Sequence, residues 1–272
     1  MRTQEIEGVC RLCHRHRQLK DSHFLPRALY KFCFRPEETS ALYVSDSATW
    51  LSSTQVSQHL LCGECEQRFN QNGEEWTLWH CYRGKHFRLR QLLNAAQPDS
   101  VSDTMRLYSA NDIPGLNIEA LVYFAISILW RGAAASWRFR RDEIDGPIEI
   151  GPYQEPFRRY LLGMDSFPLN TAVTISVANF ESPLLRALKF PQGSIADGYR
   201  TFLFNIPGIS FMIFVGKKIP DEVMEFQAAG PGRFILLTDY EKYLAADIMF
   251  KLKTAKSIGK APKLALWGGT SV

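Results

Sequence analysis

The residues best suited to bind a metal are four cysteines in two pairs. Cys10 and Cys13 form one Cys-x-x-Cys pair, and Cys62 and Cys65 form the second. Tetrahedral zinc takes four nitrogen or sulfur ligands, and a turn of this spacing presents two thiolates on one side. Gly63 suits the second turn because glycine adopts positive φ and lets backbone N–H groups approach sulfur. The sequence therefore predicts a structural zinc site formed by these four cysteines.

The other cysteines and histidines are weaker candidates for metal binding. The N-terminus lacks the apolar segment of a secretion signal, so we expect a reducing, cytoplasmic location that favours metal over disulfides. Buried, reduced cysteines without metal are the alternative for the two pairs. Cys33 and Cys81 have no partner at ligand spacing and are expected to be small core residues. His14 and His16 could replace a cysteine ligand or belong to a solvated loop.

One histidine between the two cysteine pairs could activate water. His23 lies in the run Ser22-His23-Phe24-Leu25-Pro26, inside the loop that a bound metal would close. An imidazole titrates near neutral pH, so it can act as the general base in phosphodiester hydrolysis. A divalent cation beside it would stabilise the charge that develops on the phosphate. The alternative is a strand histidine that is hydrogen-bonded to the backbone.

The order of these residues resembles the HNH endonuclease family, ββα-metal nucleases built on a treble-clef zinc finger. The resemblance covers residues 8–75 and depends on the two cysteine pairs and the run around His23. It implies that His23 is the general base on a strand and that Pro26 is the proline of the family pattern. It also implies cleavage of nucleic acid, with a role in defence against phage or foreign DNA by analogy.

Three positions of this chain depart from the family pattern. Ser22 stands where the family usually has Asp or His, and Glu66 stands where it commonly has His or Asn. The asparagine in the middle of the family motif would correspond to Ser57 or Gln58 of this chain. Glu66 is a possible ligand of a catalytic Mg²⁺ or Mn²⁺, because a carboxylate oxygen suits these cations. Weaker candidates for the same role are Asp21, Asn70 and Glu74.

Basic residues flank the cysteine pairs. The net charge is +4, and the residues from 11 to 31 include six Lys or Arg against one acid. The residues from 83 to 90 add four more. Such residues can contact phosphates, although a solvated basic face is the alternative for each of them. The candidate nucleic-acid-binding residues are Arg15, Arg17, Lys20, Arg27, Lys85 and Arg88.

The pattern of apolar and turn residues predicts an α+β chain in three parts. Residues 1–95 form a Cys/His-rich, HNH-like zinc-binding domain, residues 96–116 a linker, and residues 117–272 a larger α+β recognition or interaction domain. We expect a helix over 64–82, interrupted near Asn72-Gly73, with Phe69, Trp76 and Trp79 on its core face. A long apolar helix capped by Asn117 is expected to reach about residue 141. Strands are expected at 172–178, 199–205, 209–215 and 234–238.

The interpretation that joins these features is a metal-dependent endonuclease with His23 as general base. Its alternative is a non-catalytic treble-clef zinc finger that binds nucleic acid or a protein partner. DNA is the expected nucleic acid, and the C-terminal domain could hold a protein partner. The longest apolar run, residues 118–130, is short and contains Glu119, so no membrane contact is expected.

Overall fold

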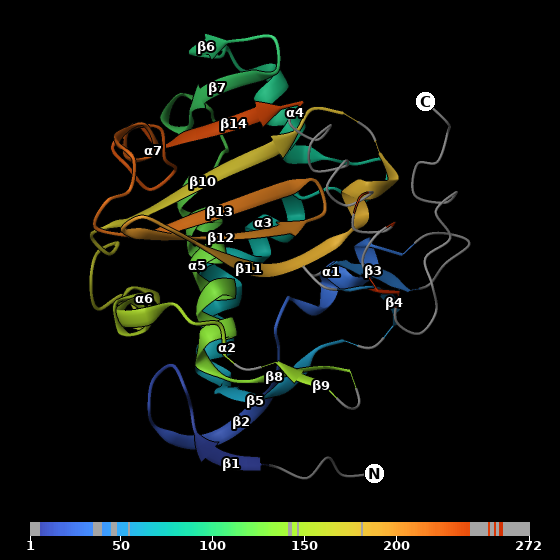
Figure 1. Cartoon of the computed structure of the whole chain (residues 1–272), viewed down its shortest axis with the longest axis vertical. Helices are drawn as coiled ribbons and strands as arrows, with labels where there is room; N and C mark the ends of the chain where they lie inside the picture. The colour runs from blue at the N-terminus through green and yellow to red at the C-terminus, as the bar shows by residue number, and fades with distance from the viewer. Residues whose placement is uncertain are drawn as a thin grey trace.

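The described part of the chain is a mixed α+β structure (Figure 1). A computed structural model describes residues 6–34, 40–44, 48–53, 55–140, 143–145, 147–180 and 182–239, together with Phe250, Lys253 and residues 256–257. Their strands form one ten-stranded, one three-stranded and one two-stranded sheet. Across these residues we find no helix with the length and apolar character needed to cross a membrane.

The three-stranded sheet carries the predicted finger. Its antiparallel strands β1 (Ile6–Val9), β2 (His16–His23) and β5 (Ser57–Cys62) lie in the order β1-β2-β5. Strand β5 runs directly into helix α2 (Gly63–Phe69). Strands β1 and β2 thus form a hairpin, and β5, which follows α1, β3 and β4 in sequence, pairs with β2 and leads into the helix. The sheet lies at the lower end of the molecule in Figure 1.

The helix predicted over 64–82 is confirmed, and its interruption has a definite form. Helix α2 continues through a π-helical segment, η1 (Asn70–Glu74), into helix α3 (Glu75–His80). A Cβ atom on Gly73 would lie 2.9 Å from the backbone nitrogen of Phe124, so glycine permits the close approach of the neighbouring helix. Phe69 is buried as predicted, but the expectation for Trp79 is wrong, because 53% of this residue is exposed.

The ten-stranded sheet collects strands from distant parts of the sequence. All four predicted C-terminal strands are confirmed, as β10, β12, β13 and β14. Residues from the predicted linker supply β6 and β7, and residues from the predicted finger domain supply β3 and β4. The strand order is β15 (Lys256–Ser257), β4 (Ala48–Ser52), β3 (Ala41–Val44), β11 (Leu188–Ala196), β12 (Tyr199–Ile206), β13 (Ile209–Gly216), β10 (Thr171–Ala178), β14 (Phe234–Thr238), β7 (Met105–Ser109) and β6 (Ser100–Val101).

Helix α5 (Ile118–Ala134) joins the sheet to the finger. The side chain of Asn117 accepts a hydrogen bond from the Ala120 backbone N–H at 2.9 Å, which confirms the predicted cap. The helix packs against the large sheet, α3, η1 and α6, so its apolar residues are buried on all sides. It ends at Ala134 and not near residue 141. The chain then forms strand β8 (Trp137–Arg140), which pairs with β9 (Glu143–Asp145).

The buried apolar residues of the described ranges include one large cluster from Cys10 to Leu237 and a small cluster around Phe214. The large cluster includes three of the paired cysteines and the inner side chains of the ten-stranded sheet, so the finger and the sheet share a core. The remaining helices lie around it. They are α1 (Arg27–Phe32), α4 (Arg88–Ala95), α6 (Gln154–Leu161) and α7 (Asp221–Glu225), with 3₁₀ turns at Ala110–Asp112, Gly151–Tyr153 and Pro183–Arg186.

Candidate metal centre

The structure brings the four paired cysteines together. The Sγ atoms of Cys10, Cys13, Cys62 and Cys65 lie within 4.8 Å of one another, and those of Cys13 and Cys62 are 3.9 Å apart. A zinc–sulfur bond of about 2.3 Å places the sulfurs of a tetrahedral site roughly 3.8 Å apart. The donor set and its spacing therefore fit a structural zinc ion. Over the described ranges, no second group of three or more His, Cys, Asp or Glu residues could hold a metal.

Two short backbone turns position the sulfurs. In the first turn the His14 N–H donates to the Cys10 carbonyl at 2.9 Å, and His14 itself adopts a φ of 59°. In the second turn Cys62 precedes the first residue of α2, and its N–H donates to the Cys10 Sγ at 3.3 Å. Gly63 does not adopt positive φ, contrary to expectation, because it is already helical. The residue with a left-handed backbone conformation is His14, in the first turn.

The pKa values of Cys10, Cys62 and Cys65 are shifted by their shared surroundings. The Cys65 thiol donates a hydrogen bond to the Cys10 sulfur, which lowers the pKa of Cys10 to about 4. The same hydrogen bond raises the pKa of Cys65, while burial raises the pKa of Cys62. Negative charge thus develops in a mostly buried cluster at the N-terminus of α2, whose dipole favours it. A divalent cation would neutralise this charge and allow all four sulfurs to be thiolates.

The first cysteine turn is anchored to the C-terminal part of the chain. The Arg158 Nη1 atom donates to the carbonyl of Leu12 at 2.6 Å, although 146 residues separate them. The remaining donors of Arg158 contact the Glu155 carboxylate at 2.6 and 2.7 Å, which fixes the guanidinium. Leu12 is itself fully buried. Displacement of the turn would therefore disturb helix α6 as well as the finger.

His23 is the last residue of β2, the position that the HNH resemblance gives to the general base. It pairs with Ser57 on β5, and Ser22 pairs with Gln58, so the predicted middle positions do lie opposite the histidine. Ser22, however, is buried, and its hydroxyl accepts a hydrogen bond from the Leu61 N–H at 3.1 Å. The side chain of Gln58 donates to the Ser136 carbonyl at 3.0 Å. Both polar neighbours of His23 thus serve the structure.

Glu66 takes part in a buried ion-pair group that the sequence did not reveal. Arg131, with a side chain 2% exposed, lies 3.8 Å from a Glu66 oxygen and 2.5 Å from a Glu74 oxygen. Its guanidinium also lies 4.7 Å from the centre of the Phe69 ring. The signal in the sequence was a cation that directly follows the apolar run 118–130, within the expected helix. A catalytic Mg²⁺ or Mn²⁺ bound by Glu66, with His23 as the general base, stays a prediction.

The candidate phosphate contacts fall into two classes. Two of them contact other side chains: Arg17 pairs with Glu64 at 2.5 Å, and the Arg88 guanidinium lies 3.6 Å from the centre of the Trp79 ring, a contact that involves no ion pair. The others are exposed on or near the finger and on the turn after α3. These exposed residues are Arg15, Lys20, Arg27 and Lys85.

Comparisons with protein-family models, with curated proteins and with solved structures find nothing that matches the chain. The case for a zinc site thus depends on the cysteine geometry, which is compatible with a zinc-finger-like structure.

We predict that the purified chain binds about one zinc ion, and that Cys65→Ser loses it. Loss of the metal should cost several kcal/mol and lower the melting temperature by roughly 10 °C or more. Elemental analysis and thermal unfolding measure both effects. Cys81→Ala is the matched control, because Cys81 is similarly buried but lies outside the cluster. Equal zinc content in wild type and Cys65→Ser would contradict the assignment.

We predict that Arg131→Leu destabilises the fold by about 3–5 kcal/mol, because two carboxylates lose their buried partner. Urea unfolding measures the change. Arg159→Leu is the control, since it breaks an exposed pair with Asp165 and should alter stability little. A similar, small effect of both substitutions would show that the buried group contributes little.

Proposed function

We propose that this chain is a zinc-stabilised protein that binds duplex nucleic acid through its treble-clef-like finger. The observation that carries the proposal is the convergence of the four cysteines between a strand hairpin and the start of α2. A metal at this point would hold the hairpin rigidly against the helix. Such a module can present side chains to a phosphate backbone without a large core of its own.

The charges around the finger support nucleic acid as the ligand. Arg15 precedes β2, Lys20 lies on β2, and Arg27 begins α1, and all three are exposed. Exposed cations grouped on one small module favour a polyanion, and their contacts with phosphate carry no sequence information. A protein partner for the large sheet remains the other part of the proposal, and no described contact argues for a particular one.

We predict that the double substitution Lys20→Ala/Arg27→Ala weakens duplex DNA binding equally for different sequences. Removing one phosphate-binding cation should reduce the slope of log K against log salt by about 0.9, so the pair should reduce it by roughly 2. Fluorescence anisotropy over a salt series measures this slope. Lys218→Ala is the control, because Lys218 pairs with Asp197 on the large sheet. An unchanged slope in the double variant would remove the finger as the binding surface.

Hydrolysis is the second candidate function, and the place of His23 favours it. His23 is the last residue of β2, which pairs with the strand that leads to the second cysteine pair, and it is partly exposed. In this proposal His23 takes a proton from water, and Glu66 contributes a carboxylate oxygen to Mg²⁺ or Mn²⁺. The pairing of Glu66 with Arg131 and the burial of Ser22 argue for binding as the primary function.

If hydrolysis occurs, we predict that His23→Ala abolishes cleavage of DNA in Mg²⁺ or Mn²⁺ and leaves zinc content and melting temperature unchanged. Gel analysis of plasmid and linear substrates measures cleavage. His59→Ala is the control, since His59 is exposed on the neighbouring strand opposite Asp21. Wild-type protein that never cleaves with either metal leaves binding as the function.

A further inference from the structure

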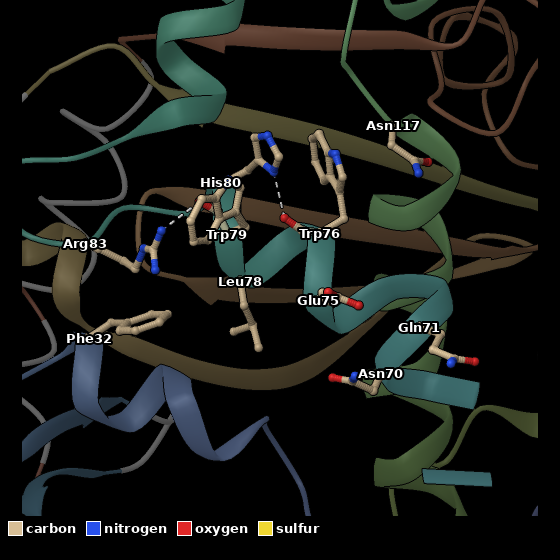
Figure 2. A pocket seen from close by; sticks show the side chains of 10 residues that line it. All are labelled: Phe32, Asn70, Gln71, Glu75, Trp76, Leu78, Trp79, His80, Arg83 and Asn117. Atoms are coloured by element: carbon tan, nitrogen blue, oxygen red, sulfur yellow. Dashed lines mark hydrogen bonds between the residues drawn. The ribbon is translucent and has the colours of Figure 1, made fainter. Parts of the chain in front are cut away.

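A groove with a volume of about 750 Å³ lies along helix α3 (Figure 2). It is lined by residues of α3 and η1, with Phe32 from α1 and Asn117 from the start of α5. The lining includes two tryptophans and a histidine on α3. It is separate from the cysteine cluster, which lies at the other end of the continuous α2–η1–α3 helix.

The aromatic side chains of this groove are arranged as a surface. Trp79 is 53% exposed, whereas Trp50, Trp130 and Trp137 are buried. Trp76 stacks on His80 with the ring centres 3.7 Å apart and the planes 16° apart. The His80 Nδ1 donates to the Trp76 carbonyl at 2.8 Å, and burial lowers the pKa of His80. Figure 2 shows the Trp76 and His80 rings side by side, both projecting from one side of the helix.

Cations surround this aromatic surface. Arg83 donates to the Trp79 carbonyl at 3.1 Å, and its guanidinium lies 4.9 Å from the centre of the Trp79 ring. The Arg88 guanidinium lies 3.6 Å from the same ring centre, and Lys85 is exposed between the two arginines in sequence. Glu75 is the acidic residue of the lining. The groove therefore suits a ligand that has both planar rings and negative charge.

We propose that this groove binds single-stranded nucleic acid, with an unpaired base stacked on the exposed ring of Trp79 and phosphates on Arg83, Lys85 and Arg88. The inference extends the proposed nucleic-acid binding to a second surface with a different form of the ligand. Bases of a single strand are free to stack on aromatic side chains, whereas those of a duplex are already stacked. Stacking tolerates any base, so the groove needs little sequence preference.

The experiment compares a thymidine oligonucleotide with a duplex of the same length, using tryptophan fluorescence and anisotropy. Wild type should bind the single strand with quenching of its fluorescence. Trp79→Ala should bind it about five- to hundredfold more weakly, the effect of removing one base–aromatic stack, and should bind the duplex normally. Trp79→Phe should retain most of the affinity. Leu169→Ala is the control, because Leu169 is an exposed apolar residue outside the groove.

The outcomes separate the two proposals. Equal single-strand affinity of wild type and Trp79→Ala overturns the groove as the site. Wild type that binds the duplex but not the oligonucleotide overturns the groove inference and leaves the finger proposal standing. Binding of the oligonucleotide that depends on Trp79, without any binding of the duplex, supports the groove and overturns the finger proposal. Failure of both probes overturns both.

Discussion

The convergence of four cysteine sulfurs is the constraint on which the finger depends. Cys13 and Cys62 are 49 residues apart in sequence, yet their sulfurs lie 3.9 Å apart in a largely buried cluster. Two backbone turns bring the sulfurs together, and a bound cation would join them through four bonds and offset the repulsion between thiolates. The same four bonds would fix the start of α2 relative to the hairpin. The direction of the whole α2–η1–α3 helix follows from that point.

The α2–η1–α3 helix is also positioned by its contact with α5. Gly73 lets the backbones approach closely, and Arg131 of α5 reaches two carboxylates, on α2 and on η1. The buried pair between Arg131 and Glu74 favours the register in which its charges meet, because separating them would leave a buried charge without its partner. The π-helical segment places Glu74 where it meets this cation. The cysteine cluster and the ion pairs with Arg131 thus both orient the α2–η1–α3 helix.

The sequence was most informative where short-range chemistry decides the structure. The cysteine spacing predicted the cluster, Asn117 predicted its cap, and the apolar runs predicted β10, β12, β13 and β14. The pairing of strands that are distant in sequence could not be predicted in the same way. Strands β3 and β4 join a sheet built mainly from residues after 170, through the pairing of β3 with β11, which lies far along the chain. Only tertiary contact determines such a pairing, because each strand alone is compatible with several neighbours.

The sequence also could not predict which single polar residues are buried and which aromatic residues are exposed. Helical periodicity placed Trp79 with Phe69 on a core face, but the π-helical segment adds a residue to one turn and changes which side chains face inward. The Trp79 indole therefore lines the groove, whereas Glu66 and Glu74 lie near Arg131.

The continuous α2–η1–α3 helix joins the finger to the groove. Its 18 residues span about 27 Å, roughly eight base pairs of duplex DNA. The finger and the groove therefore lie at a fixed separation. If both bind nucleic acid as we propose, a molecule with a duplex segment and an unpaired end would contact both at once and bind more strongly than to either surface alone.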